Sequence, residues 1–262
     1  MKLVPKKSLG QNFLIDQNTI RKICETGNIN EKDSVLEIGP GTGKLSEAIL
    51  SRAPQKFHVI EKDKRLIENL KKKFKNNVVV INEDILKYNL KNLSDKNLIV
   101  FGNLPYNIST QILTKFIKYD KTDFLYKKLI FLFQKEVADR ILAHDNTKNY
   151  GRLSIFSSWK LNIKKIMDID ASCFYPKPKV LSSLLIFEPK SNFVEFKKSK
   201  NLEYITNIFF NQRRKMIKKP LSILFKDPKK VIGELNLDVK LRPQNLDKDT
   251  FYKICLLYEK IN

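Results

Sequence analysis

The stretch Glu37-Ile-Gly-Pro-Gly-Thr-Gly43 sets the architecture of the N-terminal part of this 262-residue chain. It overlaps the end of an apolar run, Ser34 to Ile38, which is typical of a buried strand. Glycines at positions 39, 41 and 43 let the backbone turn tightly and let a ligand approach the main chain. An ordinary strand-to-helix turn would not need three alternating glycines, so we expect a ligand-binding loop.

The glycine spacing separates three classes of ligand. A phosphate-binding P-loop needs glycine at position 38 and Ser or Thr after Lys44, but the chain has Ile38 and Leu45 there. A dinucleotide-binding fingerprint needs its third glycine at position 44, which is Lys44. The remaining G-x-G-x-G pattern resembles the S-adenosylmethionine loop of Rossmann-like methyltransferases.

Apolar runs alternate with helical patterns through the first half of the chain. The predicted buried strands are Ser34 to Ile38, Lys56 to Ile60, Val78 to Asn82, Asn97 to Phe101 and Lys128 to Phe133. The helical patterns between them include Lys44 to Arg52 and Lys64 to Phe74. This alternation predicts an α/β fold with a mostly parallel, doubly wound sheet.

The pattern changes in the second half of the chain. Two apolar runs, Ile163 to Ile169 and Val180 to Phe187, have no long helix between them, which predicts an antiparallel edge of the sheet. From Pro189 the pattern is helical to the end, and breaks are expected at Pro220, Pro228 and Pro243. We therefore expect a catalytic domain over residues 1–189 and a small C-terminal helical domain over residues 190–262.

The chain is strongly basic, with 50 Lys and Arg against 28 acidic residues and a net charge of +22. Its 42% hydrophobic residues are sufficient for a globular core. A nucleic-acid partner explains the charge, because each neutralised phosphate releases condensed counterions. The alternative is drift in an A/T-rich genome, which favours codons for Lys, Asn and Ile.

The cysteines and histidines form no disulfide or metal-ligand pattern; they are Cys24, Cys173, Cys255, His58 and His144. We therefore expect no metal and a reduced, cytoplasmic compartment. The basic start, Met1 to Gly10, is not followed by the apolar core of a signal peptide. No run of about 18 apolar residues occurs, so no membrane span is expected.

Two carboxylates follow successive predicted strands. Glu61 ends the second strand, 18 residues after Gly43, near the spacing at which an acidic side chain accepts from ribose hydroxyls. Asp84 follows the third strand and is expected to accept from the adenine amine of a cofactor. Each alone fits a solvated loop residue, but the carboxyl ends of parallel strands meet at one crevice. Together they favour a cofactor site.

The segment Gly102-Asn-Leu-Pro-Tyr-Asn-Ile-Ser109 follows the fourth strand. Pro105 restricts Leu104 to extended geometry, which would fix Asn103 and nearby carbonyls as acceptors and Tyr106 as a stacking face. Acceptors that hold both hydrogens of an adenine amine out of conjugation localise its lone pair toward a methyl electrophile. A sulfonium methyl is already activated, so positioning and electrostatics would supply most of the rate. The alternative is an Asn-x-Pro turn with a packed tyrosine.

A target base in folded RNA must leave its stack and lie between aromatic side chains. Tyr106 is one candidate. Phe174, in Cys173-Phe-Tyr-Pro-Lys-Pro-Lys-Val-Leu-Ser-Ser183, is the other, and two prolines would stiffen its loop. Because loop aromatics usually pack into a core, both interpretations of Phe174 stay open on the residues alone.

Further ordered segments match one family. They are Ser8-Leu-Gly-Gln-Asn-Phe-Leu14, Gln134-Lys-Glu-Val-Ala138, Tyr150-Gly-Arg-Leu-Ser154 and Phe210-Asn-Gln-Arg-Arg-Lys215. With the loops above, they make the chain resemble the small-subunit ribosomal RNA adenine N6,N6-dimethyltransferases over nearly its whole length. The resemblance implies a monomer that transfers methyl groups from S-adenosylmethionine to two adjacent adenines near the 3′ end of this RNA during ribosome assembly.

The resemblance also implies residue roles. The implied cofactor contacts are Gln11, Asn12, Leu14, Gly39, Gly41, Glu61, Asp84, Ile85 and Asn103. Asn103 would lie at the methyl-transfer centre, shaped by Leu104 and Pro105, and Tyr106 and Phe174 would flank the base. The chain departs from the family pattern at Glu83, where glycine is common, and at Leu132-Phe133, where Met-Val is usual. Neither departure touches the proposed chemistry.

The run Gln212 to Lys219 places five cations in eight residues. We expect Arg213, Arg214, Lys218 and Lys219 to bind phosphates of the RNA, and the alternative is a solvated helix face.

Three other functions compete with this one. The related large-subunit RNA methyltransferases are disfavoured by the forms Pro40-Gly-Thr-Gly43 and Asn211-Gln-Arg-Arg214. A DNA adenine methyltransferase uses a similar catalytic loop, but no candidate DNA-recognition domain is found. A non-catalytic binding module would not need Asn103, Tyr106 and the glycine loop.

Overall fold

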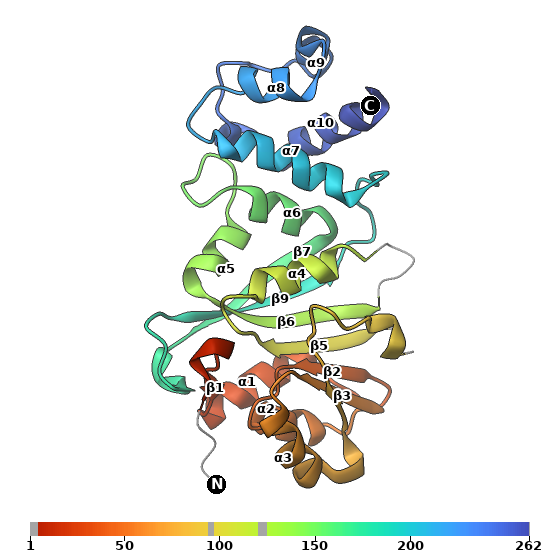
Figure 1. The fold of residues 1–262 in the computed structure, drawn as a ribbon, viewed down its shortest axis with the longest axis vertical. Coiled ribbons are helices and arrows are strands. Elements are labelled where there is room, and N and C mark those ends of the chain that lie inside the picture. Colours follow the sequence, from red (N-terminus) through yellow and green to blue (C-terminus); the bar gives the residue numbers. More distant parts are fainter. Residues whose placement is uncertain (1–4, 94–96, 120–124, 262) are drawn as a thin grey trace. The chain divides into compact units, whose positions relative to one another are not determined.

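The computed structural model describes residues 5–93, 97–119 and 125–261, and the chain divides into two compact units (Figure 1). The first unit contains Met1–Ala138 and Asn162–Pro189, and the second contains Asp139–Leu161 and Lys190–Asn262. The middle segment of the chain, which the sequence assigned to the catalytic domain, therefore clusters with the C-terminal helices. Residues 1–4 of the basic stretch Met1 to Gly10 lie outside the described residues.

A seven-stranded sheet forms the centre of the first unit, in the order β4-β3-β2-β5-β6-β9-β7. Its strands are β2 Ser34–Ile38, β3 Lys56–Glu61, β4 Val79–Asn82, β5 Leu98–Asn103, β6 Tyr126–Gln134, β7 Leu161–Ile169 and β9 Ser182–Pro189. Strands β2 to β6 pair in parallel, whereas β9 pairs antiparallel with β6. The predicted Rossmann-like sheet with an antiparallel edge is confirmed.

A second, very small sheet joins β1 Phe13–Leu14 to β8 Phe174–Tyr175. The pairing is antiparallel, and it places Phe13 opposite Tyr175 and Leu14 opposite Phe174. Two segments about 160 positions apart in the chain are thereby tied together.

Helices cover both faces of the large sheet (Figure 1). The helices α1 Gln17–Gly27, α2 Lys44–Leu50 and α3 Lys64–Phe74 share one apolar core with Ile130 and Leu132 of β6. Phe131 lies between these two and contacts Phe116 of α4 Ser109–Ile117, with ring centroids 5.7 Å apart. Because neighbouring residues of a strand point to opposite faces, α4 covers the other face.

Local sequence sets the helix starts. Helix α1 begins after Asp16, whose carboxylate accepts from the Thr19 N–H at 2.7 Å. Helix α3 begins after Asp63, which accepts from the Arg65 N–H at 3.2 Å. Helix α2 begins instead after Gly43, which has a positive φ and offers no side-chain cap. The glycine loop therefore leads directly into a helix whose first turn has no side-chain cap.

The second unit is helical. It holds α6 Arg152–Lys160, α7 Ser199–Asn211, α8 Lys218–Leu224, α9 Pro228–Leu235 and α10 Lys248–Ile261, while α5 Lys135–Leu142 spans the boundary between the units. Short 3-10 helices occur at Lys7–Leu9, Lys75–Asn77, Leu90–Leu93, Ala171–Cys173 and Pro243–Asn245.

Buried polar contacts hold the second unit together. Glu259 of α10 accepts from the Lys197 N–H at 2.8 Å and from the Asn201 side chain at 2.7 Å, beside the start of α7. The hydroxyl of Tyr252, also on α10, donates to the Ile155 carbonyl of α6 at 3.0 Å. These bonds show why the middle segment clusters with the C-terminal helices.

Two expectations from the sequence and one alternative need correction. Strand β4 lies at the sheet edge and is not buried, as the 53% exposure of Val79 shows. Pro220 does not break a helix: α7 ends earlier, at Asn211, and Pro220 lies in the first turn of α8, where its missing N–H has no intrahelical partner to lose. The cation run is not one helix face, because most of it lies between α7 and α8.

No helix within residues 5–93, 97–119 and 125–261 is both long enough and apolar enough to cross a bilayer.

The two glycines Gly39 and Gly43 provide a matched test of the loop. At Gly43 an added Cβ would stand 2.8 Å from the buried Phe74 ring, whereas at Gly39 the nearest atom would be 3.9 Å away. Both have a positive φ, which costs an L-residue about 1–2 kcal/mol. We expect Gly43→Ala to lose about 2–5 kcal/mol of unfolding free energy and Gly39→Ala only about 1–2. Urea unfolding without cofactor measures both, and equal losses would contradict the Phe74 contact.

Candidate active site

A cleft of about 150 Å³ opens in the first unit where β2, β3 and β5 end. The predicted cofactor residues that line it are Gln11, Asn12, Gly39, Gly41, Glu61, Asp84, Ile85 and Asn103. The predicted catalytic residues that line it are Asn103, Leu104, Pro105 and Tyr106. Segments from five places in the chain thus meet at one cleft.

Two predicted residues do not line this cleft. Leu14 and Phe174 are 5% and 2% exposed, face each other across β1 and β8, and belong to the core beneath the sheet. Leu14 borders a smaller adjoining cavity beside the glycine loop. In this structure the Phe174 ring cannot touch a base, because the core surrounds it; its role beside the base stays a prediction.

Glu61 is the best-defined carboxylate in the cleft. It is 7% exposed, and its oxygens accept from the Asp63 N–H at 2.8 Å and the Gly41 N–H at 3.3 Å. Burial raises its pKa above the ordinary value, although these backbone donors oppose the shift. Each carboxylate oxygen has two lone pairs, so Glu61 keeps acceptor capacity for a ligand that brings hydroxyl donors.

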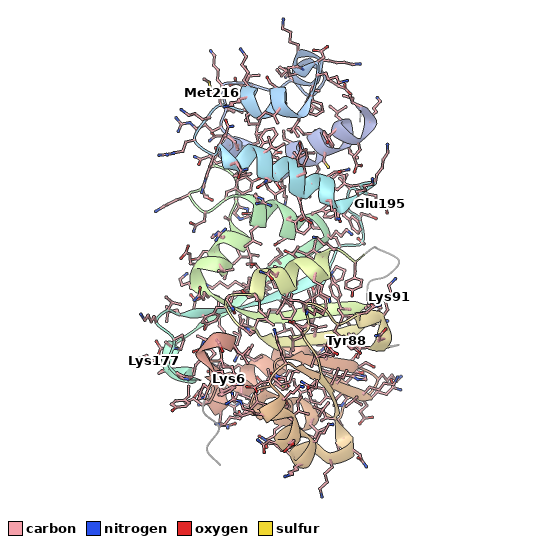
Figure 2. The ribbon with its side chains drawn as sticks, viewed as in Figure 1. Lys6, Tyr88, Lys91, Lys177, Glu195 and Met216 are labelled. Atoms are coloured by element: carbon pink, nitrogen blue, oxygen red, sulfur yellow. The ribbon has the colours of Figure 1, made fainter. Side chains whose placement is uncertain are left out.

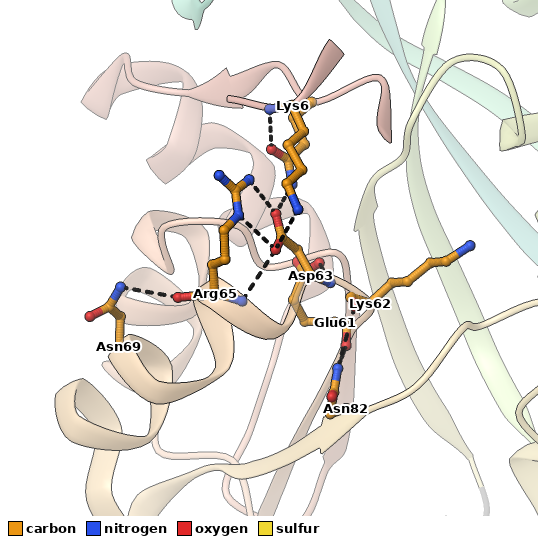
Figure 3. A network of polar contacts seen from close by, with 8 residues as sticks. Lys6, Glu61, Lys62, Asp63, Arg65, Asn69 and Asn82 are labelled. Atoms are coloured by element: carbon orange, nitrogen blue, oxygen red, sulfur yellow. Dashed lines mark hydrogen bonds and ion pairs between the residues drawn. The ribbon is translucent and has the colours of Figure 1, made fainter. Parts of the chain in front are cut away.

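Asp63 organises the N-terminal segment over this strand end (Figure 3). Its carboxylate accepts from the Arg65 guanidinium at 2.7 Å and from Gln11 Nε2 at 3.0 Å, and Lys6 Nζ lies 3.9 Å away. These partners, the Arg65 bond first, hold the pKa of Asp63 well below its usual range. A permanently ionised Asp63 therefore fixes Gln11 at the cleft wall, next to Glu61.

Asp84 is held from both sides. One oxygen accepts from Lys62 Nζ at 2.9 Å and the other from the Leu86 N–H at 2.9 Å. Burial alone would raise the pKa of Asp84, but these donors outweigh it and the pKa lies below the ordinary value. Lys115 of α4 fixes the same loop, since its ammonium donates to the carbonyls of Ile85 at 2.8 Å and Tyr88 at 2.5 Å.

Glu37 supports the glycine loop from beneath. It is 1% exposed and accepts from the Ser46 hydroxyl of α2 at 2.6 Å. Burial raises the pKa of Glu37 to about 7, and the nearby charge of Glu61 acts in the same direction. Glu37 is thus a structural link between β2 and α2 and does not line the main cleft.

The catalytic loop is anchored at both ends. Asn103 Nδ2 donates to the Asn12 carbonyl at 2.8 Å, which ties the loop to the N-terminal segment. The Tyr106 hydroxyl shares a 2.6 Å hydrogen bond with the Ser182 hydroxyl at the start of β9. Burial raises the pKa of Tyr106, so its phenol stays neutral near pH 7. With its nitrogen engaged, the Asn103 amide has its oxygen left as an acceptor.

The predicted phosphate-binding residues all lie in the second unit. Arg214, Lys218 and Lys219 are exposed, but Arg213 is only half-exposed. Its guanidinium donates to Gln244 Oε1 at 3.2 Å and to the carbonyl of Lys148. Arg213 therefore holds three segments of the second unit together through its Nε and Nη2 atoms.

Four supporting residues were missed by sequence reasoning: Ser46, Lys62, Lys115 and Ser182. Each makes a hydrogen bond to a residue in another element or loop, nine positions away for Ser46 and at least 22 for the other three. Serines and lysines are common on surfaces, so only the tertiary contact distinguishes these four.

Comparison with known proteins identifies a family and relatives to which this chain is similar. The model of the family described as ribosomal RNA adenine dimethylase matches residues 4–260. A protein of Pelagibacter ubique (strain HTCC1062) named ribosomal RNA small subunit methyltransferase A is 53% identical, and the match covers 98% of this chain and 97% of that protein. A protein of the same name from Prochlorococcus marinus (strain AS9601) is 40% identical, with 95% and 94% covered.

Solved structures show the same fold. A dimethyladenosine transferase from Plasmodium falciparum superposes with a TM-score of 0.80 at 28% identity, covering 95% of this chain and 98% of that one. The 23S rRNA methyltransferase ErmE gives 0.70 at 21% identity, covering 95% and 100%, which is likeness of fold only. The chain belongs to the ribosomal RNA adenine dimethylase family and is an adenine dimethyltransferase of the class that depends on a methyl donor of the S-adenosylmethionine type.

Proposed function

We propose that this protein transfers methyl groups from S-adenosylmethionine to N6 of two adjacent adenines near the 3′ end of small-subunit ribosomal RNA, giving N6,N6-dimethyladenine during ribosome assembly. We expect it to act as a cytoplasmic monomer. The observation that carries the proposal is the meeting, in one cleft, of Glu61, Asp84 and the loop from Asn103 to Tyr106. The name of the relatives in Pelagibacter and Prochlorococcus favours the small-subunit RNA as substrate.

The cleft fits the proposed cofactor. Around Gly39 the nearest atom to an added Cβ would be the Asn103 carbonyl oxygen, 3.9 Å away, so a ligand can approach the main chain there. Glu61 would accept from the ribose hydroxyls, and Asp84 from the adenine amine beside Ile85. Gly41 differs, because the Phe13 ring already covers its Cβ side; its N–H supports Glu61 instead. When bound, the cofactor supplies a methyl group activated by its sulfonium.

The chain's own contribution is positioning. Asn103, held through its nitrogen by the Asn12 carbonyl, would accept one hydrogen of the target amine with its oxygen. A carbonyl of the same loop, which Pro105 keeps extended, would accept the other. The amine lone pair is then directed at the methyl group, and neither metal nor strong base is needed. Tyr106, fixed by Ser182, offers a ring on which the base can stack.

The proposal is tested by incubating partly assembled small subunits with labelled S-adenosylmethionine and mapping the modified bases. We expect N6,N6-dimethylation of two adjacent adenines. Asn103→Ala should bind cofactor and RNA but lose most turnover, because its amide acts mainly as the transition state forms. Asn107→Ala, in the same cleft, is the control and should stay active. Modification of large-subunit RNA, or a fully active Asn103→Ala, would refute the assignment.

Glu61→Ala should weaken cofactor binding at least about tenfold and leave RNA binding unchanged. Hydrogen bonds to a charged group are worth about 1.5–3 kcal/mol each, and about 1.4 kcal/mol corresponds to a factor of ten. Calorimetry with S-adenosylhomocysteine is the measurement. Glu83→Ala removes a carboxylate from the exposed wall of the same cleft and is the matched control. Equal dissociation constants for Glu61→Ala and Glu83→Ala would show that Glu61 does not bind the cofactor.

The phosphate-binding role of the cation run is tested with Arg214, Lys218 and Lys219 changed together to Gln. Each phosphate that the variant no longer binds should flatten the dependence of log K on log salt by about 0.7–0.9, and cofactor affinity should not change. Arg213→Gln serves as a separate variant, because its bonds to Gln244 and Lys148 predict lower thermal stability. A salt titration of binding to small subunits measures the slopes. If the slope of log K against log salt is unchanged in the triple variant, the cation run is a solvated surface that does not bind phosphates.

A further inference from the structure

A loop of unusual chemistry lies between two residues, Tyr175 and Ser182, whose partners Phe13 and Tyr106 line the cleft. Residues 175–181, here called the rim loop, comprise the last residue of β8 and the connection to β9, and they read Tyr-Pro-Lys-Pro-Lys-Val-Leu. Both ends of the loop are tied to residues of the candidate active site, and its exposed side chains serve no core. The loop therefore needs an explanation other than packing.

The first end of the rim loop is tied to the cofactor side of the cleft. Tyr175 lies directly opposite Phe13 in the β1–β8 pair, so the two side chains share one face of that small sheet. Phe13 lines the cleft, and its ring lies against Gly41, where an added Cβ would be 2.7 Å away. Leu14 and Phe174 occupy the opposite face and point into the core. Tyr175 is therefore on the face of the pair that borders the cleft.

The second end is tied to the catalytic loop. Ser182 follows the rim loop immediately, and its hydroxyl shares the 2.6 Å hydrogen bond with Tyr106. The Lys135 N–H donates to the Leu181 carbonyl at 2.9 Å, which fixes the backbone there. Two prolines, at positions 176 and 178, restrict the backbone between these anchors. The loop is held as a stiff edge of the site.

Its side chains combine an aromatic ring with positive charge. Tyr175 is 59% exposed, and Val180 and Leu181 are 44% and 40% exposed. Lys177, labelled in Figure 2, and Lys179 are exposed as well, and no acidic residue occurs between positions 174 and 182. Asp170 lies within electrostatic range of Lys177, but its carboxylate accepts from the Ser172 N–H at 2.8 Å.

We propose that the rim loop binds a single-stranded stretch of the RNA next to the target adenine, with a neighbouring base stacked on Tyr175 and the flanking phosphates bound by Lys177 and Lys179. Aromatic rings that alternate with cations are the means by which proteins bind single strands. A base in a duplex has no free face to stack, so the loop selects unpaired RNA. The inference rests on the proposed function, because it assumes that RNA enters this cleft.

Charge and apolar surface together favour RNA over a protein partner. The exposed group on the loop carries two cations and no anion, on a chain of net charge +22. A protein partner would need an acidic surface to match these cations, whereas every stretch of RNA carries phosphates. The loop differs from the cation run of the second unit in having a stacking ring, so it can distinguish unpaired bases from a bare backbone.

The test uses the full chain and a fluorescently labelled octamer of adenylate as the probe. We expect Tyr175→Ala to weaken octamer binding about 5- to 150-fold, because stacking a base on an aromatic ring is worth about 1–3 kcal/mol. Tyr175→Phe should restore it, since the ring is kept. Lys177→Gln with Lys179→Gln should flatten the salt dependence by about 0.7 for each phosphate that is no longer bound. Tyr204→Ala, an exposed tyrosine in the second unit, is the matched control and should bind as the parent does.

Each outcome bears on the inference. Affinities within twofold for the parent and Tyr175→Ala, no binding of the octamer by the parent, or equal binding of a duplex of the same length would each overturn it. Calorimetry with S-adenosylhomocysteine should give the same affinity for all variants, which separates the loop from the cofactor site. A different result would contradict the proposed function alone. In that case the parent would bind the octamer through Tyr175 but would not methylate the adenines of small subunits.

Discussion

The parallel register of the central strands is what brings the site together. Ile38 lies beside Ile60 on one side and Gly102 on the other, so β2, β3 and β5 end at the same level. Backbone bonds continue this order past the strands, since the Gly39 N–H donates to the Ile60 carbonyl at 2.9 Å. A slip of one residue would turn every side chain to the other face of the sheet and would remove Glu61 from the cleft. The apolar core that fixes this register is therefore also what positions the carboxylate.

Two buried carboxylates share this strand end, and their environments differ. Glu37 is surrounded by core and Ser46, and its pKa of about 7 allows it to be neutral at physiological pH. Glu61 has two backbone N–H donors and lines the cleft, where further donors can approach. A neutral Glu37 reduces the repulsion that an ionised Glu61 would otherwise meet. The pair thus leaves the acceptor oxygens of Glu61 at the position where ribose hydroxyls would bind.

Local patterns in the sequence predicted the sheet, the glycine loop and the lining of the cleft, because each depends on spacing within a short segment. Gly39, Glu61 and Asp84 could be found in this way. Phe174 could not be placed, because β1 and β8 have only two residues each and no periodicity reveals their pairing. The role of Ser182 could not be predicted either, because its partner, Tyr106, lies 76 positions away in the chain. The grouping of residues 139–161 with the C-terminal helices likewise depends on distant contacts such as Tyr252 with Ile155.

The two basic regions differ in what they can recognise. The exposed cations Arg214, Lys218 and Lys219 offer charge without a stacking ring, and phosphate contacts of that kind carry affinity but no base information. The rim loop offers a ring beside its cations, and the catalytic loop offers fixed acceptors. On the proposed function, an unpaired adenine would be selected in the first unit, which holds the cleft lined by Asn103 and Tyr106. The exposed cations of the second unit would add affinity that does not depend on the base, so the proposed choice of target bases would depend on the groups that line the cleft of the first unit.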